Sequence, residues 1–245
     1  NIEAFDAAFL VGENTFRLDE GYLNPPPKKA GKGDLVMMSG NGAVAKGCIE
    51  AGLDTFFGYP ITPATTIMER LATDLPTHGK RMLQTEDEIS AISATIGAGY
   101  AGARAATATS GPGFALMAEM MGLGTMAEVP AVIFVSQRGG PSTGMPTKTE
   151  QSDLNIAVFG AAGDGQRIVL APTNVEGCYK CAGKAFEIAE RFQTPVVVLL
   201  DLYLSNRYEA VEFPAHNPFK ADCSKPVGKL KKDQPYHRFA LTKDF

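Results

Sequence analysis

Short apolar runs alternate with longer amphipathic segments along most of this chain. Runs such as 196–200 (VVVLL) show no polar alternation, which indicates strands that are covered on both faces. The apolar runs predict strands at 35–39, 54–58, 82–85, 104–109, 131–136, 167–171 and 195–201. The longer segments predict helices at 41–52, 63–75, 86–101, 113–126 and 174–192. This order predicts an α/β fold, with a mostly parallel sheet and helices on both of its faces.

The pattern divides the chain into three parts. Residues 34–206 contain the predicted strands and the helices between them, and they form the predicted domain. Before it, residues 1–33 combine a helical piece with NPPPKKAGKGD, whose proline, lysine and glycine are typical of a linker. After about residue 206 the pattern decays, so we expect residues 207–245 to be an extended tail or a linker to a further domain.

Ligands of such a sheet bind beyond the carboxyl ends of its strands. Four connections that follow predicted strands contain most of the unusual residues of this chain. They are 58–63, 85–88, 110–113 and 137–146.

The first connection, GYPITP (58–63), places two prolines around a single hydroxyl side chain. Each proline fixes its own φ near about −65° and restricts the residue before it, so Thr62 is held at a strand end beside the start of a helix. From there Thr62 could contact a ligand, or it could cap the helix that follows. The residues alone leave both interpretations open.

The second connection begins a helix with three acidic residues, Glu86, Asp87 and Glu88, in an otherwise nearly uncharged segment. The first turn of a helix favours negative charge, which is a sufficient structural reason for all three. A carboxyl drawn into an apolar helix face would instead have a raised pKa and could share a proton with a ligand nitrogen. Glu88 opens such a face, and Glu86, nearer the strand end, is its rival. The residues that continue this face at helical spacing are Ala91, Ile92, Thr95 and Gly99.

The third connection, in TATSGPGFALM (107–117), places Ser110 and Gly111 between a strand and a helix. Backbone N–H groups at that helix start could bind an anion or a polar ring edge. The chain has neither GxGxxG nor GxxxxGK(S/T), which excludes those nucleotide-binding motifs.

The fourth connection, in VSQRGGPSTGMPTKTEQSD (135–153), places Arg138 at the end of an apolar strand. An arginine there can hold a carboxylate through two parallel hydrogen bonds, or it can pair with a local acid such as Glu150 or Asp153. Lys148 is a second cation in the same loop.

Composition excludes several classes of protein. The 245 residues are 44% hydrophobic, enough for the core of one large domain, and the net charge of −4 offers no general attraction to nucleic acid. No apolar run approaches the ~20 residues of a membrane span, and the four cysteines are too few for a disulfide scaffold. We therefore expect a cytoplasmic protein.

One cysteine pair has the spacing of a metal or redox motif. Cys178 and Cys181 form a CxxC, but they lie inside the predicted helix 174–192, and no second pair completes a metal site. We expect no metal site in this chain, and no Ser/His/Asp set is recognisable. If the chain is catalytic, a cofactor carries the difficult chemistry.

Three motifs, in this order, resemble one known family: GYPITP, QTEDEISAISATIGAGYAGARAATATSGPGFALM and SQRGGPSTGMPTKTEQSD. Residues 40–201 resemble the thiamine diphosphate pyrimidine-binding domain of the 2-oxoacid:ferredoxin oxidoreductases. TSGPG followed by QRGGPSTG is closest to α subunits of the 2-oxoglutarate branch. The resemblance implies reversible oxidative decarboxylation of a 2-oxoacid to an acyl-coenzyme A and carbon dioxide, with electrons passed to ferredoxin.

The same resemblance implies roles for individual residues. Glu88 would activate the pyrimidine ring, Thr62 would contact the 2-oxo end of the substrate, and Arg138 would hold its carboxylate. Lys148, placed beside Arg138 in the loop, is the candidate for the distal carboxylate of 2-oxoglutarate. Thr62 and Glu88 are also expected to contact the cofactor. The further cofactor-binding candidates are Tyr59, Pro60, Ile61, Ser110 and Gly111.

The resemblance also implies partners. A β subunit would carry the diphosphate site, Mg²⁺ and a 4Fe–4S cluster, so that thiamine diphosphate is shared between the two subunits. The GDG at 163–165 lacks the asparagine that the family pattern places after it, so we read it as a turn. A γ domain or subunit is a further partner, since residues 1–12 resemble the end of one.

Two alternatives remain at this point. The chain could belong to a pyruvate or branched-chain 2-oxoacid:ferredoxin oxidoreductase. It could also be a non-catalytic assembly subunit, although Glu88, Thr62 and Arg138 argue against that.

Overall fold

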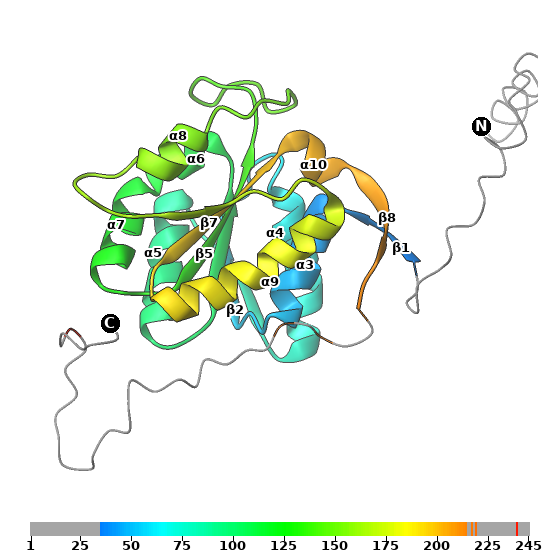
Figure 1. The fold of residues 1–245 in the computed structure, drawn as a ribbon, viewed down its shortest axis with the longest axis horizontal. Coiled ribbons are helices and arrows are strands. Elements are labelled where there is room, and N and C mark those ends of the chain that lie inside the picture. Colours follow the sequence, from blue (N-terminus) through cyan, green and yellow to red (C-terminus); the bar gives the residue numbers. More distant parts are fainter. Residues whose placement is uncertain (1–34, 215–216, 218, 220–238, 240–245) are drawn as a thin grey trace, which may run out of the picture.

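The structure, a computed structural model, describes residues 35–214 together with 217, 219 and 239 (Figure 1). Within these residues a six-stranded sheet has the order β3-β2-β4-β5-β7-β6, and every neighbouring pair is parallel. This confirms the predicted α/β class. The strands are β2 (Thr55–Gly58), β3 (Arg81–Gln84), β4 (Ala105–Thr109), β5 (Ala131–Gln137), β6 (Ile168–Leu170) and β7 (Pro195–Asp201).

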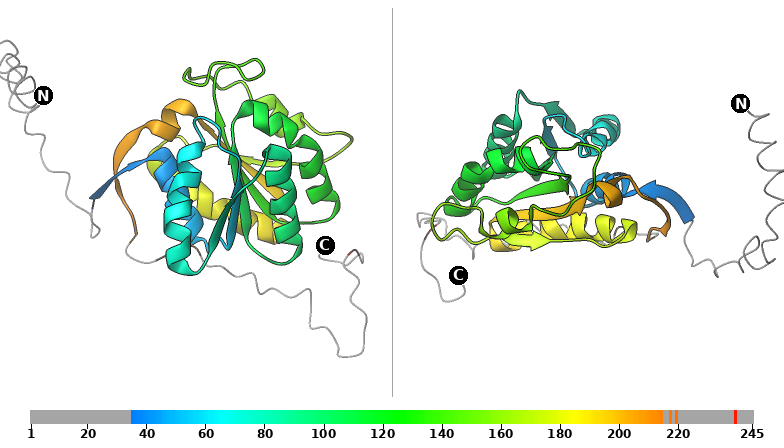
Figure 2. Two further views of the ribbon diagram at one scale, coloured as in Figure 1. Left: turned by 180° about the vertical axis from the view of Figure 1, so that it is seen from behind. Right: turned by 90° about the horizontal axis from the view of Figure 1, so that it is seen from above.

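Helices cover both faces of the sheet, as the sequence predicts. The central strand β5 sends Val132 and Phe134 into the core on one face, and Ile133 and Val135 into the core on the other. Figure 2 shows α9 and the α5–α7 helices on opposite sides of the sheet. The first core is covered by α3 (Gly40–Glu50), α4 (Thr65–Asp74) and α9 (Val175–Phe192). The second is covered by α5 (Glu88–Tyr100), α6 (Gly111–Leu116), α7 (Ala118–Met126) and α8 (Leu154–Phe159).

The first predicted strand forms, but not in the parallel sheet. β1 (Leu35–Ser39) pairs antiparallel with β8 (Tyr208–Glu212), and the two make a separate two-stranded sheet. This corrects the prediction that 35–39 opens the parallel series. Its partner, β8, lies in 207–245, where the sequence pattern indicated no element. The two strands are more than 160 residues apart, so no local pattern could indicate that they pair.

Helix boundaries also differ from the prediction. The single helix predicted at 113–126 is two helices that meet at Met117, which ends α6 and precedes α7. The helix predicted from residue 63 begins at Thr65 instead. Three short elements were not predicted: the 3-10 helix Leu75–His78, α8 and α10 (Leu202–Asn206).

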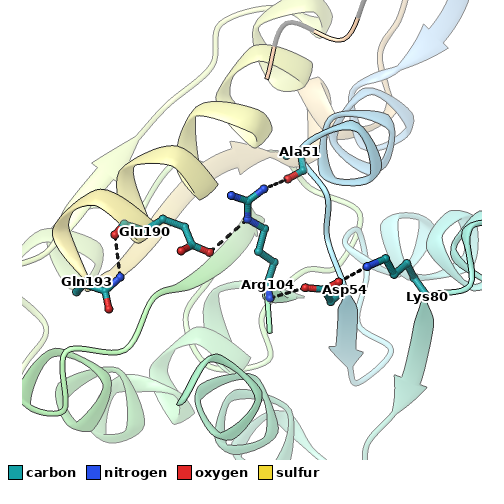
Figure 3. A network of polar contacts seen from close by, with 6 residues as sticks. All are labelled: Ala51, Asp54, Lys80, Arg104, Glu190 and Gln193. Atoms are coloured by element: carbon teal, nitrogen blue, oxygen red, sulfur yellow. Dashed lines mark hydrogen bonds and ion pairs between the residues drawn. The ribbon is translucent and has the colours of Figure 1, made fainter. Parts of the chain in front are cut away.

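A polar network joins the amino ends of three strands, at the edge opposite the loops singled out above (Figure 3). The backbone N–H of Arg104 donates to Asp54 Oδ2 at 2.9 Å, and Asp54 also forms an ion pair with Lys80. The guanidinium of Arg104 donates to the carbonyl of Ala51 and pairs with Glu190 at 3.3 Å. Charged groups at this edge therefore hold the strand ends in place.

The predicted helix and linker of residues 1–33 lie outside the described residues, as does most of the predicted tail. Within the part of the chain that the structure describes, no helix combines the length and the hydropathy that crossing a membrane requires.

Candidate active site

The loops that the sequence singled out meet at one edge of the sheet. β2, β4 and β5 are parallel neighbours, so their carboxyl ends lie side by side. They continue into 58–63, 110–113 and 137–146 respectively, and β3, beside β2, leads into α5. In Figure 1 the long loop after β5 projects at the top of the fold, above α6 and α8.

The three acids after β3 have three different environments. Glu86 precedes α5 and is exposed, while Asp87 is the N-cap of α5 and accepts a 2.7 Å hydrogen bond from the backbone N–H of Ser90. Glu88 is the first residue of the helix and is 7% exposed. Of the two candidate carboxylates, Glu86 is therefore exposed and Glu88 is the one that is buried.

Glu88 packs against the backbone of α6. A Cβ atom on Gly113 would lie 2.5 Å from Glu88 Oε1 and 2.1 Å from Thr109 Oγ1, so only glycine fits beneath the carboxylate. No described residue donates a hydrogen bond to this carboxylate. The side chain is largely buried, but its carboxylate oxygens are not among the fully buried polar atoms that lack a partner, so a ligand can still reach them.

Ser110 is the N-cap of α6, three residues before Gly113. It is fully buried, and its Oγ has no hydrogen-bond partner among the described residues. Gly111 follows it and packs against Asp153, whose Oδ2 would be 2.7 Å from a Cβ at that position. A fully buried hydroxyl without a partner among the described residues therefore lies at the start of the helix whose Gly113 packs against Glu88.

Arg138 follows β5 and is 7% exposed. Its Nη1 donates to the carbonyl oxygen of Thr62 at 2.6 Å, and its Nη2 donates to that of Thr143 at 2.7 Å, while its buried Nε has no partner. The predicted alternative, an ion pair with Glu150 or Asp153, does not occur within the described residues. Burial lowers the pKa of Arg138, and the nearby negative charge of Glu88 opposes that change.

GYPITP forms the loop between β2 and α4. Thr62 is exposed and is followed by a cis peptide bond to the buried Pro63. The N-cap of α4 is Ala64, with no side-chain hydrogen bond, so the alternative that Thr62 caps the helix is wrong. Tyr59 and Pro60 are exposed and Ile61 is half-buried. The hydroxyl of Thr62 is thus left for another contact.

Asn41, which the sequence analysis did not single out, lies beneath this loop. It is fully buried in the first turn of α3, and its Nδ2 donates to the carbonyl of Pro63 at 2.8 Å and to Thr66 Oγ1 at 2.6 Å. Only the asparagine in an otherwise small and apolar helix start (GNGAVA) could have indicated it.

Lys148 lies on the exposed loop 141–150. Its carbonyl accepts from the N–H of Gly139 at 2.8 Å, and Glu150 accepts from the N–H of Gly140 at 2.8 Å, which closes the base of the loop. The structure places the Lys148 backbone near the end of β5, as predicted. It shows no ion pair of the Lys148 ammonium within the described residues.

Asp153 and Gln137 join the end of this loop to the sheet. Gln137 Oε1 accepts from the backbone N–H of Asp153 at 2.9 Å, and its Nε2 donates to the carbonyl of Leu200 at 3.1 Å. Burial, followed by the charge of Glu150, raises the pKa of Asp153. The sequence analysis did not predict that Gln137 and Asp153 support the site.

The cysteine pair lies in the first two turns of α9. Cys178 is buried and Cys181 is half-buried, and burial raises the pKa of the Cys178 thiol to about 12. A thiol with that pKa is unreactive at neutral pH. No group of three or more His, Cys, Asp or Glu side chains in the described part of the chain could hold a metal ion.

Comparison with known proteins identifies the fold around this site. The family model described as the thiamine diphosphate-binding part of pyruvate flavodoxin/ferredoxin oxidoreductase matches residues 46–243. This chain belongs to that family. The match confirms the resemblance drawn from the three motifs.

Individual relatives are similar over most of the chain. The 2-oxoglutarate synthase subunit KorA of Archaeoglobus fulgidus is 48% identical over 181 residues, which cover 74% of this chain and 52% of that protein. The α subunit of 2-oxoacid:ferredoxin oxidoreductase 1 of Aeropyrum pernix is 43% identical over 228 residues, covering 87% of this chain and 36% of that protein.

A solved structure is similar as well. The 2-oxoglutarate:ferredoxin oxidoreductase from Magnetococcus marinus, with 2-oxoglutarate, coenzyme A and succinyl-CoA bound, has a TM-score of 0.77 and 43% identity. The similarity covers 87% of this chain and 37% of that one. This chain therefore spans about half, or less, of the length of the relatives that it matches.

Proposed function

We propose that this chain is the pyrimidine-binding part of the α subunit of a thiamine diphosphate-dependent 2-oxoglutarate:ferredoxin oxidoreductase. The observation that carries the proposal is the largely buried Glu88 side chain, whose carboxylate accepts no hydrogen bond from the described residues and lies at the carboxyl edge of a parallel sheet. Membership of the thiamine diphosphate-binding family and the names of the relatives support the same conclusion.

The residues around Glu88 fit the cofactor's pyrimidine ring. Glu88 would share a proton with the ring nitrogen N1′, because its carboxylate accepts no hydrogen bond from the described residues. Ser110 Oγ, buried without a partner among the described residues, is a second polar atom for the ring edge. Thiamine diphosphate, when bound, supplies the electron sink that loss of carbon dioxide requires. The remaining ring contacts come from Gly111 and from Tyr59, Pro60, Ile61 and Thr62.

Arg138 and Thr62 bind the reacting end of the 2-oxoacid. A guanidinium has five N–H donors, and the two hydrogen bonds to carbonyl oxygens leave three for a carboxylate. Arg138 holds the 1-carboxylate, and the exposed hydroxyl of Thr62 orients the 2-oxo group. Both side chains lie at the same edge as Glu88, whose charge reaches Arg138.

Lys148 pairs with the distal carboxylate of 2-oxoglutarate. Its loop leaves the end of β5 directly after Arg138, and its side chain is exposed and has no ion pair among the described residues. A flexible ammonium in this position can reach a substrate that extends outward from Arg138.

The proposed active site also needs residues outside this chain. A β subunit carries the diphosphate site, Mg²⁺ and a 4Fe–4S cluster, ferredoxin accepts the electrons, and coenzyme A accepts the acyl group. A γ domain or subunit completes the assembly. The names of the relatives describe them as subunits, which supports this division, and the similar solved structure contains coenzyme A, which supports coenzyme A as the acceptor.

A broader substrate range is the second candidate. The Aeropyrum pernix relative is named for 2-oxoacids in general, not for 2-oxoglutarate. A panel of 2-oxoglutarate, pyruvate and branched-chain 2-oxoacids with the complete complex separates the two. A preference for pyruvate or a branched-chain acid would replace the 2-oxoglutarate assignment.

The substitution Glu88→Gln in the complete complex tests the cofactor role. We expect folding and assembly to be kept and exchange of the thiazolium C2 proton to slow by at least about 100-fold, since general acid–base groups contribute about 10²–10⁴. The matched control is Glu86→Gln, which alters an exposed carboxylate two residues away. Normal exchange in Glu88→Gln would remove Glu88 from this role.

A further inference from the structure

Two consecutive carbonyl groups in GYPITP are each held by a buried side chain from a distant segment. Arg138, after β5, donates to the carbonyl of Thr62 at 2.6 Å. Asn41, in the first turn of α3, donates to the carbonyl of Pro63 at 2.8 Å. Because the peptide planes on both sides of Pro63 are fixed, the backbone that carries the Thr62 side chain is fixed as well.

Asn41 is well suited to hold the loop. The residue is fully buried, and its amide uses its second N–H on Thr66 Oγ1 at 2.6 Å, so that one side chain joins the loop to the first turn of α4. An asparagine amide has two N–H donors, so both are in use.

The helix that carries Asn41 is itself held firmly. Ser39 caps α3 by accepting from the N–H of Gly42 at 3.1 Å. A Cβ on Gly40 would lie 2.0 Å from the carbonyl oxygen of Leu204, so this turn packs directly on the backbone of α10. The amide of Asn41 therefore has little freedom to follow a moving loop.

The arrangement leaves one group of the loop unused. Thr62 is exposed and does not cap α4, while the carbonyl groups of Thr62 and Pro63 are both bound. A rigid backbone under an exposed hydroxyl is expected where the direction of that hydroxyl matters to a ligand.

We propose that Asn41 is a positioning residue that directs the Thr62 hydroxyl toward the 2-oxoacid. This rests on the proposed function, in which Thr62 contacts the substrate. Asn41 acts only through the backbone of the loop and does not itself touch the substrate.

A double-mutant cycle in the complete α–β complex, with 2-oxoglutarate as the substrate, tests the proposal. Thr62→Val removes the hydroxyl and keeps the shape of the side chain, and Asn41→Leu removes both N–H donors at similar volume. Each single variant is expected to lower kcat/KM by about tenfold or more, because small misplacements near the reacting group have large effects. The double variant is expected to match Thr62→Val, since Asn41 has no effect once the hydroxyl is gone.

Two controls accompany the cycle. Thr66→Val removes the second partner of Asn41 but keeps the bond to Pro63, and should leave kcat/KM within about twofold of wild type. Thr62→Ser keeps a hydroxyl, so Asn41→Leu should again lower kcat/KM in that background. If Asn41→Leu does not assemble, Asn41→Ala removes the same donors and carries the same expectations.

The outcomes separate this inference from the proposed function. If Asn41→Leu has wild-type kcat/KM while Thr62→Val is slow, the inference about Asn41 is wrong and the proposed role of Thr62 stands. Single effects that multiply in the double variant also overturn it, because a purely structural loss is additive in free energy. Wild-type kcat/KM in Thr62→Val overturns the proposed role of Thr62, and the inference with it.

Discussion

The carboxylate of Glu88 lies so close to Gly113 that a methyl group on that glycine would meet Oε1 at 2.5 Å. The first turn of α5 and the first turn of α6 thus share one small space at the carboxyl edge of the sheet. The glycine of TSGPG that packs against Glu88 is therefore the second one, Gly113.

Replacing Gly113 with alanine should displace Glu88. The added Cβ would also lie 2.1 Å from Thr109 Oγ1, so we expect a loss of about 1–3 kcal/mol in the free energy of unfolding, as for other overpacked sites. Thiamine diphosphate should bind the complete complex more weakly. Chemical unfolding of the chain and titration of the complex with the cofactor measure the two effects.

The control for this change is Gly97→Ala in α5, where a Cβ would meet nothing within 4 Å. We expect that variant to be more stable by about 0.5–1 kcal/mol, because alanine favours a helix over glycine. Equal effects at the two positions would contradict the close packing of Glu88 on Gly113.

Arg138 joins two loops through their backbones, and lysine should not replace it. A single ammonium cannot reproduce the two hydrogen bonds to the carbonyls of Thr62 and Thr143, which diverge from one guanidinium. We expect Arg138→Lys to loosen the exposed loop 141–150 and to speed tryptic cleavage after Lys148, measured by mass spectrometry over time.

Arg167 provides a matched comparison, because it also donates to carbonyl oxygens, those of Ile156 at 2.9 Å and Gly160 at 2.6 Å. Arg167→Lys should leave cleavage after Lys148 unchanged. If both variants accelerate that cleavage equally, the effect is a general loss of stability and the specific link through Arg138 is wrong.

Substituting Lys148 with methionine tests its proposed pairing with the distal carboxylate. The ratio of kcat/KM for 2-oxoglutarate to that for pyruvate should fall by about tenfold, the equivalent of one charge-assisted hydrogen bond. Lys184→Met, on the exposed side of α9, should leave the ratio unchanged. An unaltered ratio in Lys148→Met would end the assignment.

The network around Asp54 predicts a pH-dependent contribution to stability. Burial acts to raise the pKa of Asp54, but hydrogen bonds from Lys80 and from the backbone of Arg104, with their charges, outweigh it and lower the pKa. A carboxyl whose pKa is lower in the folded state stabilises the fold above its unfolded pKa of about 3.9. That contribution is lost as the pH falls through the folded value.

Asp54→Asn should therefore be less stable than wild type near pH 7, and the difference should shrink toward about pH 3. Urea unfolding across this range measures it. Asp164→Asn, in the connection between α8 and β6, removes a carboxylate that makes no hydrogen bond to the described residues, and should show no such trend. A difference that is constant with pH would refute the role of the Asp54 charge.

The main features of the sheet could be predicted from local pattern. Apolar runs without alternation predict covered strands, and the parallel order of β2, β4 and β5 brings their following loops together. The face that begins at Glu88 was also predictable, since helical spacing depends only on neighbours in sequence. Its buried members, Ala91, Ile92, Thr95 and Gly99, are those that the spacing indicates.

Pairing between distant segments could not be predicted in this way. The partner of β1 is β8. The five residues of β1 do not by themselves specify the twist or the register of that pair. The choice between Glu86 and Glu88 depended on where α5 begins, and the cap at Asp87 decided it. The orientation of GYPITP depended on Asn41 and Arg138, which lie 22 and 76 residues from the carbonyl groups that they bind.

The sequence by itself determined the fold class, the edge of the sheet that holds the site and the residue types gathered there, because hydrophobic periodicity and the residues that follow each strand are local properties of the chain. Tertiary structure alone decided which carboxylate is buried, which carbonyl groups Arg138 and Asn41 bind, and where β1 pairs. Burial and hydrogen-bond partners depend on segments that meet only when the chain is folded, and no window of sequence contains them.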